Sequence, residues 1–421
     1  MLGFIEAEYL EREAANMAVN KMMARTKKIV LIVAIDPGFS GCKMVVGNKK
    51  YHLGLPVIPF TILDITGQED KYTSLTTNDI IIQKNSRVYM IGEKVKKALL
   101  TDTVMNQAKT DYENFTTNVT RFKTELFDIA LEACIAWGLY NYKKEYEKDF
   151  GSAPYELENI DEGVEVRVGV ALPHANINEF NEDIYKCVEC RHSCSIRTGS
   201  DTVTVEFTVK KDNSKVASQT IMALLNETMN DLGQDVDDNV KDEFLPAVII
   251  DAGYHTVGRA LLTEALTIEK DGSDTKFAMA NVNESASEEL KKYNLIRDAA
   301  TIDELYKRGR TLDGTLYNNG IREEVDVDIV ELKNRMVQQN VNLMMDEFCK
   351  TYDDFTGIRK IIVAGGSGKM YYEYIVKYFE DKGMKRASSR CNLASGTLNG
   401  QSVDPVMAIA SGLYKTMAAE E

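Results

Sequence analysis

Two aspartates occupy matching positions in two short, glycine-containing segments. Asp36 opens Asp-Pro-Gly-Phe-Ser-Gly-Cys-Lys, and Asp251 opens Asp-Ala-Gly-Tyr-His-Thr. A tight turn of this kind directs backbone N–H groups inward and binds anions, and an aspartate beside it can hold a hydrated Mg²⁺, which prefers few carboxylates and several waters. Each segment alone is equally typical of a hairpin turn capped by aspartate. Two of them, 215 positions apart, favour a pair of turns that clamp one triphosphate from opposite sides.

A third segment, Ile361–Lys369, runs from an apolar stretch into Gly-Gly-Ser-Gly-Lys. It resembles a P-loop, which requires G-x-x-x-x-G-K-[ST]. Val363 stands where the first glycine is required, and Met370 stands where serine or threonine is required, so the pattern fails at both ends. A strand that leads through two glycines into a helix still lets the sugar and α-phosphate of a nucleotide approach the backbone closely.

The elements that must position these segments alternate between strands and helices. Short, β-branched apolar runs predict strands, and longer runs with helical spacing predict helices. The predicted strands include 28–36, 165–172, 202–209, 246–251 and 358–364, and the predicted helices include 115–142, 219–232, 328–352 and 404–418. This alternation is typical of an α/β protein. The likeness between the segments at Asp36 and Asp251 indicates two related halves.

Composition limits the function classes. The 421 residues carry a formal net charge of -15, and such an acidic surface disfavours direct, non-specific contact with nucleic acid. No apolar run approaches the roughly 18 residues of a membrane span, and Met1–Lys28 lacks the apolar core of a secretory signal. We therefore expect a cytoplasmic protein with no membrane partner, and its seven cysteines are expected to be reduced thiols.

Cys187, Cys190, His192 and Cys194 lie within eight residues and include a C-x-x-C pair. Such residues can ligate zinc. Structural zinc sites usually join two distant pairs, however, and no second pair is present in the sequence. Partly buried, reduced thiols in a short helix or turn are the preferred interpretation, and zinc binding is the alternative.

In order and spacing, the three glycine-containing segments resemble the phosphate-1, phosphate-2 and adenosine motifs of the actin/Hsp70/sugar-kinase superfamily. Within it, the chain resembles the ParM-type actin-like proteins of bacterial plasmids. Three further stretches are similar to that branch: Tyr89–Glu93, Val168–Pro173 (with Ala171 where glycine is usual) and Asp404–Thr416. The resemblance covers residues 29–417, which is nearly the whole chain.

The resemblance implies a role for each matching residue. Asp36 and Asp251 would hold magnesium through water, and Gln219 would orient the attacking water, so that Gln219 and Asp251 are the catalytic residues. The β- and γ-phosphates would lie against Gly38, Phe39, Ser40, Gly41 and Lys43 on one side, and against Gly253, Tyr254 and His255 on the other. Gly365, Gly366 and Ser367 would contact the adenosine. His255 stands where the family has threonine or glycine, and Gln219 also fits an ordinary helix N-terminus.

The resemblance further implies a two-lobed α/β, actin-like ATPase fold with a duplicated core and a nucleotide cleft between the lobes. Residues 1–28 would form an N-terminal extension. Lobe I would contain 29–220 and 395–421, with a small subdomain at about 55–115, and lobe II would contain 221–394.

The function implied is a head-to-tail filament that binds Mg²⁺ with ATP or GTP, hydrolyses the nucleotide and segregates plasmid DNA. A DNA-binding adaptor protein at a centromere-like site would link the filament to its cargo. A small-molecule kinase, or another non-polymerising member of the superfamily, is the alternative. The sequence does not separate ATP from GTP, and it indicates neither the cargo nor the handedness and strand number of a filament.

Overall fold

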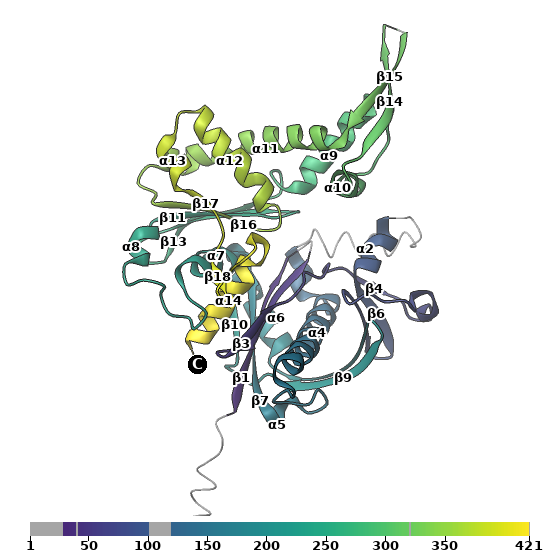
Figure 1. Cartoon of the computed structure of the whole chain (residues 1–421), viewed down its shortest axis with the longest axis vertical. Helices are drawn as coiled ribbons and strands as arrows, with labels where there is room; N and C mark the ends of the chain where they lie inside the picture. The colour runs from purple at the N-terminus through teal and green to yellow at the C-terminus, as the bar shows by residue number, and fades with distance from the viewer. Residues whose placement is uncertain (1–27, 39–40, 101–118, 320, 421) are drawn as a thin grey trace, which may run out of the picture.

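The computed structural model describes residues 28–38, 41–100, 119–319 and 321–420. These residues form two α/β lobes, a third sheet beside the first lobe and a hairpin that projects from the second (Figure 1). The predicted N-terminal extension lies almost wholly outside the described residues, as do Phe39 and Ser40. Within the described part of the chain, no helix is both long and apolar enough to cross a membrane.

The first sheet is centred on the apolar run Ile29–Pro37. Eight of the nine residues of this strand are buried, which is typical of a strand covered on both faces. The sheet order is β3-β2-β1-β7-β10. Its strands are β1 (Ile29–Pro37), β2 (Cys42–Asn48), β3 (Tyr51–Gly54), β7 (Val164–Leu172) and β10 (Ser214–Ser218). The helices α4 (Glu125–Phe150), α6 (His174–Val188) and α14 (Ala408–Ala419) pack against its strands.

The second sheet has the order β13-β12-β11-β16-β17. Its strands are β11 (Ala247–Ala252), β12 (Val257–Leu262), β13 (Ile268–Asp274), β16 (Lys360–Ala364) and β17 (Cys391–Leu393). In this lobe lie the helices α8 (Val240–Phe244), α9 (Met279–Lys291), α10 (Ala299–Lys307), α11 (Ile329–Thr351), α12 (Gly368–Asp381) and α13 (Lys385–Arg390).

The two sheets are built alike. In each, the central strand forms an antiparallel hairpin with the next strand of the chain, and on its other side it pairs in parallel with a later strand. The strand order and directions match along all five strands. The core is therefore duplicated, and Asp36 and Asp251 lie at equivalent ends of β1 and β11.

The third sheet combines distant segments of the chain. Its order is β4-β6-β5-β8-β9. The strands are β4 (Ile62–Asp64), β5 (Asp79–Lys84), β6 (Arg87–Gly92), β8 (Arg191–Thr198) and β9 (Asp201–Thr208). The segment 55–115, which the sequence suggests as a small subdomain, thus supplies three strands, and the other two follow α6. The short helix α2 (Glu93–Leu100) comes after β6.

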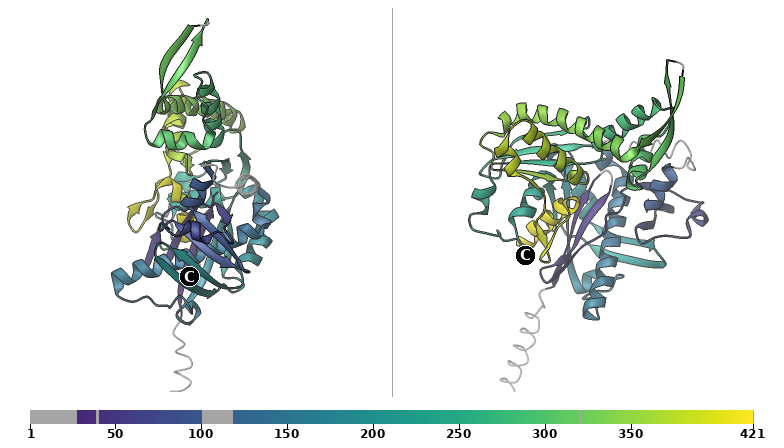
Figure 2. Two further views of the ribbon diagram at one scale, coloured as in Figure 1. Left: turned by 90° about the vertical axis from the view of Figure 1, so that its right-hand side faces the viewer. Right: turned by 45° about the horizontal axis from the view of Figure 1, so that its top comes forward.

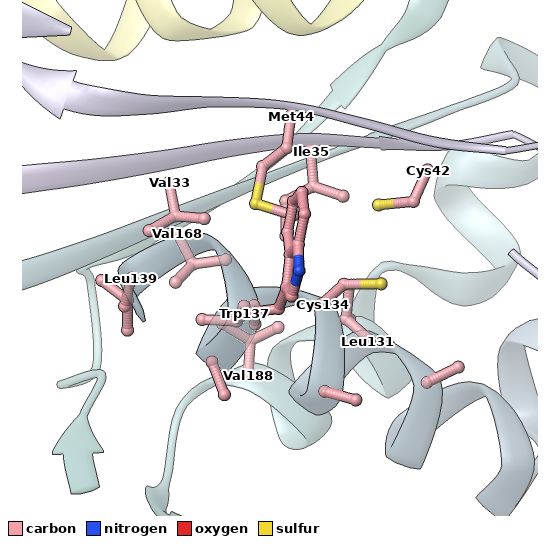
Figure 3. Packing of buried hydrophobic residues seen from close by; sticks show 14 of the residues in the cluster. Val33, Ile35, Cys42, Met44, Leu131, Cys134, Trp137, Leu139, Val168 and Val188 are labelled. Carbon is pink, nitrogen blue, oxygen red and sulfur yellow. The ribbon is translucent and has the colours of Figure 1, made fainter. Parts of the chain in front are cut away.

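A large aromatic core fixes the first lobe. Figure 3 shows Trp137 of α4 between that helix and the strands that carry Ile35 and Met44. The indole Nε1 donates to the Thr77 carbonyl over 3.0 Å, which ties the third sheet to this core. Because β1 is clamped by this packing, the position of Asp36 at its end is also fixed.

Two helices connect the lobes. The helix α7 (Gln219–Thr228) follows β10 and contacts strands of both sheets, and it crosses α14 closely. At the crossing, a Cβ on Gly412 would lie 1.9 Å from the Met222 carbonyl oxygen, so only glycine fits. Next to it, buried Lys415 donates to the Asn226 carbonyl over 2.6 Å, and burial lowers the pKa of its ammonium to about 8.

We predict that Gly412→Ala destabilises the protein by at least about 2 kcal/mol, because the added methyl group forces two backbones apart and overpacks the crossing. Urea unfolding followed by circular dichroism measures this change.

Gly138→Ala is the matched control. Gly138 is also a helical glycine, but an added Cβ would meet side chains rather than backbone, Met44 Sδ at 2.4 Å and Val46 Cγ2 at 3.2 Å. We expect a smaller loss than in Gly412→Ala, since side chains can shift more readily than backbone and alanine also favours the helix. Equal losses in both variants would show that the α7–α14 crossing has no special role.

Candidate functional site

Asp36 is the buried centre of the candidate site. The β1–β2 register places Lys43 directly opposite it, and Lys43 Nζ lies 3.1 Å from Asp36 Oδ2. Gln219 is the first residue of α7, and its Nε2 donates to Asp36 Oδ1 over 2.8 Å. Three residues singled out in the sequence, separated by up to 183 positions, therefore meet at one carboxylate.

Asp251 faces this group from the second lobe and lines the same cavity as Asp36, Lys43 and Gln219. Burial, and then the negative charge of Asp36, raise its pKa to about 7, although Lys43 acts in the opposite direction. Burial disfavours the charged form of a carboxyl group, and a neighbouring carboxylate adds to this effect. A divalent cation held beside Asp251 would favour its ionised form.

Gly365 allows the third glycine-containing segment, Ile361–Lys369, to pack closely against Asp251. It has a φ of +91°, and an added Cβ would lie 2.4 Å from Asp251 Oδ1. Ser367 N donates to the Ala252 carbonyl over 2.8 Å. Gly366 has open space beside it, since a Cβ there would meet only Val406, at 3.9 Å. The backbone of Gly366 is thus exposed to a ligand in the cleft.

The first turn is closed by a hydrogen bond from Gly41 N to the Gly38 carbonyl over 3.3 Å. A Cβ on Gly38 would lie 2.3 Å from Lys43 Nζ, so glycine leaves room for the ammonium. The predicted phosphate contacts of Phe39 and Ser40 fall outside the described residues.

The second turn is closed by a hydrogen bond from Gly253 N to the Thr256 carbonyl over 2.9 Å. The Tyr254 carbonyl accepts from Ala280 N near the start of α9, which anchors the turn. Burial and the positive charge of Arg121 lower the pKa of His255 to about 4. His255 is therefore a neutral hydrogen-bonding group near pH 7 and adds no positive charge to the site.

Arg121 is a site residue that the sequence analysis missed. It lines the cavity with Asp36, and its Nη2 donates to the Pro37 carbonyl over 2.6 Å, beside the first turn. Burial lowers its pKa to about 9, so the guanidinium remains charged near pH 7. The sequence predicts a helix from 115, but residues 119–123 form a short 3-10 helix and α4 starts at Glu125. No motif marks Arg121, because its position depends on that irregular segment.

The cleft has an inner and an outer part. The inner cavity is small, at about 40 Å³, and is lined by both aspartates, Lys43, Arg121 and Gln219. The outer cavity is wider, at about 450 Å³. Three residues line both cavities: Tyr254, His255 and Gly366. The residues that line only the outer cavity include Ser367, Met370, Tyr306 and Lys333. A charged inner end and a more apolar outer end suit a phosphate chain and a nucleoside.

The cysteine segment lies elsewhere. Cys187 is near the end of α6 and Cys194 is in β8, so the predicted short helix or turn is the end of one helix, a bend and a strand. His192 Nδ1 lies 3.2 Å from Glu132 Oε1, and Lys84 Nζ lies 2.7 Å from Glu132 Oε2. Burial raises the pKa of Cys194 to about 12. Among the described residues, no three His, Cys, Asp or Glu side chains are arranged to hold a metal ion, and the cysteines are free thiols.

Known family models give no match to this sequence, and neither do curated proteins. Solved structures do match. The structure described as "pCBH ParM non-polymerisable quadruple mutant" has a TM-score of 0.60 and 13% identity, covering 91% of this chain and 98% of that one. The actin-like protein Alp7A has a TM-score of 0.62 and 14% identity, covering 93% and 97%. A 15-stranded ParM filament from Clostridium botulinum gives 0.61 and 12%, covering 94% and 100%.

The chain therefore has an actin-like α/β fold, as the sequence predicts. Identities of 12–14% show the fold alone, and the roles of the site residues have to be argued from the geometry above.

The raised pKa of Asp251 predicts a pH effect in the ligand-free protein. Its folded pKa of about 7 lies above the ordinary value of 3.8, so the folded state binds more protons between these limits. Stability contributed by this group is therefore full below pH 4 and falls as pH rises to about 7. We predict that Asp251→Asn is more stable than the parent at pH 8, by at most about 4 kcal/mol, and that the gap narrows at pH 5.

Urea unfolding at both pH values, with a chelator and without nucleotide, measures the gap. Asp381→Asn, at an exposed carboxyl, is the control and should leave the pH dependence unchanged. A parent and an Asp251→Asn variant with the same pH dependence would contradict the shifted pKa.

Proposed function

We propose that this protein is a filament-forming, actin-like nucleotidase that hydrolyses ATP or GTP in the cleft between its lobes. The observation that carries the proposal is the meeting of Asp36, Lys43 and Gln219 opposite Asp251, at equivalent ends of two duplicated sheets. Phosphoryl transfer requires positioning and charge stabilisation more than covalent chemistry, and a cleft closed from two sides by turns provides both.

In this proposal, Asp36 and Asp251 would hold Mg²⁺ through its waters, and the ion would supply positive charge to the β- and γ-phosphates. Lys43 and the Gly38–Gly41 backbone bind the phosphates from lobe I. Gly253, Tyr254 and His255 bind them from lobe II, with His255 as a neutral donor. Arg121 adds a second cation near the first turn, and its buried position fixes that charge against the Pro37 carbonyl.

Gln219 is proposed to orient the attacking water. Its Nε2 donates to Asp36, which leaves Oε1 as the acceptor for a water proton. Gln219 also lines a second small cavity of about 20 Å³, together with Asp251, Pro173 and His174. Because an amide is a poor base, we expect hydrolysis to be slow. A slow hydrolysis step would set the lifetime of the polymer.

The nucleoside is proposed to occupy the outer cavity. Its sugar and α-phosphate would lie against Gly365, Gly366 and Ser367, where the open flank of Gly366 permits close approach. The base would lie towards Tyr306 and Met370. Either ATP or GTP is a substrate consistent with this cavity.

Polymerisation is proposed by analogy with the matched structures, one of which is described as a 15-stranded ParM filament and another as a filament of AlfA. Head-to-tail contacts that do not close into a ring give an open polymer. We propose that the filament acts in the cytoplasm and segregates plasmid DNA through a DNA-binding adaptor protein at a centromere-like site. The net charge of -15 favours an adaptor over direct DNA contact.

Light scattering with Mg²⁺ and ATP, and then GTP, tests the proposal when phosphate release is followed in parallel. We expect scattering to rise on addition of at least one nucleotide and to fall as phosphate appears. Phosphate release without any scattering, across protein and salt concentrations, would move the assignment to a small-molecule kinase or another non-polymerising member of the superfamily. If neither scattering nor phosphate release is observed, the assignment as a nucleotidase is itself contradicted.

The assigned roles predict different losses for two variants. Asp251→Ala should abolish turnover, because the metal loses one of its two carboxylates. Gln219→Ala should slow turnover about 10²-fold or more and leave nucleotide affinity within about threefold, because the side chain contacts the water and not the nucleotide. Fluorescent-nucleotide titration and phosphate release separate the two effects, and normal hydrolysis in both variants would refute the site.

A further inference from the structure

A long hairpin projects from lobe II. It consists of β14 (Thr311–Asn318) and β15 (Ile321–Asp328), which pair from Thr311↔Asp328 to Asn318↔Ile321. Figure 2 shows in both views that it stands clear of the body. Its base is held by buried Val327, and Thr315 N donates to the Tyr293 carbonyl over 2.8 Å. Among the residues that the structure describes, no hydrogen bond joins residues 316–323 to the rest of the fold outside the hairpin.

The tip of the hairpin exposes large apolar side chains. Tyr317 is 61% exposed and Ile321 is 67% exposed. Side chains of this kind at the end of a projecting element are typical of an interface, where aromatic residues supply much of the binding energy. The hairpin thus offers an apolar end to a partner.

The hairpin is also strongly acidic. It carries five acidic residues and one basic residue: Asp313, Glu323, Glu324, Asp326, Asp328 and Arg322. Asp313 and Asp326 are exposed and directly opposite each other in the ladder, and like charges in that arrangement destabilise a strand pair. Within the part of the chain that the structure describes, neither forms an ion pair. A cationic partner surface would relieve this repulsion.

The same lobe carries a surface of opposite charge at its other end. The segment 382–390, which includes α13, contains four basic residues and no acidic one: Lys382, Lys385, Arg386 and Arg390. Lys385 and Arg386 are exposed. The hairpin and α13 lie at opposite ends of α11 in Figure 1 and in the right-hand view of Figure 2. Because α11 has 23 residues, it spans about 34 Å, so the two surfaces do not meet within one molecule.

We propose that the β14–β15 hairpin of one molecule docks on the α13 surface of a second copy of this chain. The acidic face pairs with Lys385 and Arg386, and Tyr317, which lies on the same face of the ladder as Asp313 and Asp326, provides the apolar centre of the contact. Two different, complementary surfaces at opposite ends of α11 form a heterologous contact, which gives an open polymer where the rotation between copies does not close a ring. The inference rests on the proposed self-association and names the contact that carries it. Because the contact is exposed and ionic, salt weakens it.

Asp326→Lys is the decisive variant. It replaces a repelling pair across the ladder by an attracting one, so the hairpin itself becomes no less stable. We expect the critical concentration for nucleotide-dependent assembly to rise at least fivefold, while nucleotide affinity of the monomer is unchanged. A purely structural role of Asp326 cannot produce this combination.

Lys385→Glu should weaken assembly to a similar extent, and the double variant Asp326→Lys with Lys385→Glu should recover at least half of the loss, because the pair is restored with reversed signs. Glu158→Lys with Glu162→Lys is the control, since both residues are exposed in lobe I near the opposite end of the molecule. This control should assemble like the parent. Pelleting assays at graded protein concentration give the critical concentrations.

The outcomes separate this inference from the proposed function. If the parent assembles and Asp326→Lys assembles equally well, the hairpin contact is refuted and filament formation stands. If both single variants weaken assembly and the double variant gives no recovery, the hairpin and α13 do not contact each other, and the pairing is refuted. A parent that remains monomeric with Mg²⁺ and either nucleotide refutes both proposals.

Discussion

The repulsion between two enclosed carboxyl groups, Asp36 and Asp251, is the constraint on which the site depends. Each ends the central strand of its own sheet, and the duplicated topology brings the two strand ends to opposite walls of one cleft. Burial first, and then the negative charge of Asp36, raise the pKa of Asp251 to about 7, and Lys43 offsets only part of this effect. Packing of the two cores therefore holds the two carboxyl groups in an arrangement that a divalent cation would stabilise. The free energy of binding such a cation with a nucleotide would favour closure of the two lobes.

The parts of this arrangement that sequence predicts are those fixed by local residues. A buried β-branched run that ends in Asp-x-Gly defines the strand, its end and its turn, which is why Asp36, Asp251 and the Gly365–Ser367 segment are brought together as the motifs indicate. The resemblance also places Gln219 at the start of a helix, where the structure has it. These elements need no knowledge of distant packing, because the chain returns on itself within a few residues.

The parts that escape prediction depend on distant or irregular segments. The third sheet joins strands about 100 positions apart, so β8 is hidden in a segment whose cysteines suggest a helix or turn. Arg121 reaches Pro37 from a 3-10 segment that helical spacing does not reveal. Most of β15 is exposed to solvent, and the apolar residues of the β14–β15 hairpin are scattered along it, so they give only a weak strand signal in the sequence.

Gln219 joins the site to the movement of the lobes. It is the first residue of α7, which contacts both sheets and is held against α14 where Gly412 allows the two backbones to touch. Since Gln219 is hydrogen-bonded to Asp36 while Asp251 belongs to the other lobe, a rotation of the lobes about α7 would change the distance from Gln219 to Asp251 more than the distance from Gln219 to Asp36. Under the proposed function, a contact that favours one lobe angle would therefore also change how well a water is aligned for attack. Assembly and hydrolysis would then be coupled through the first residue of α7.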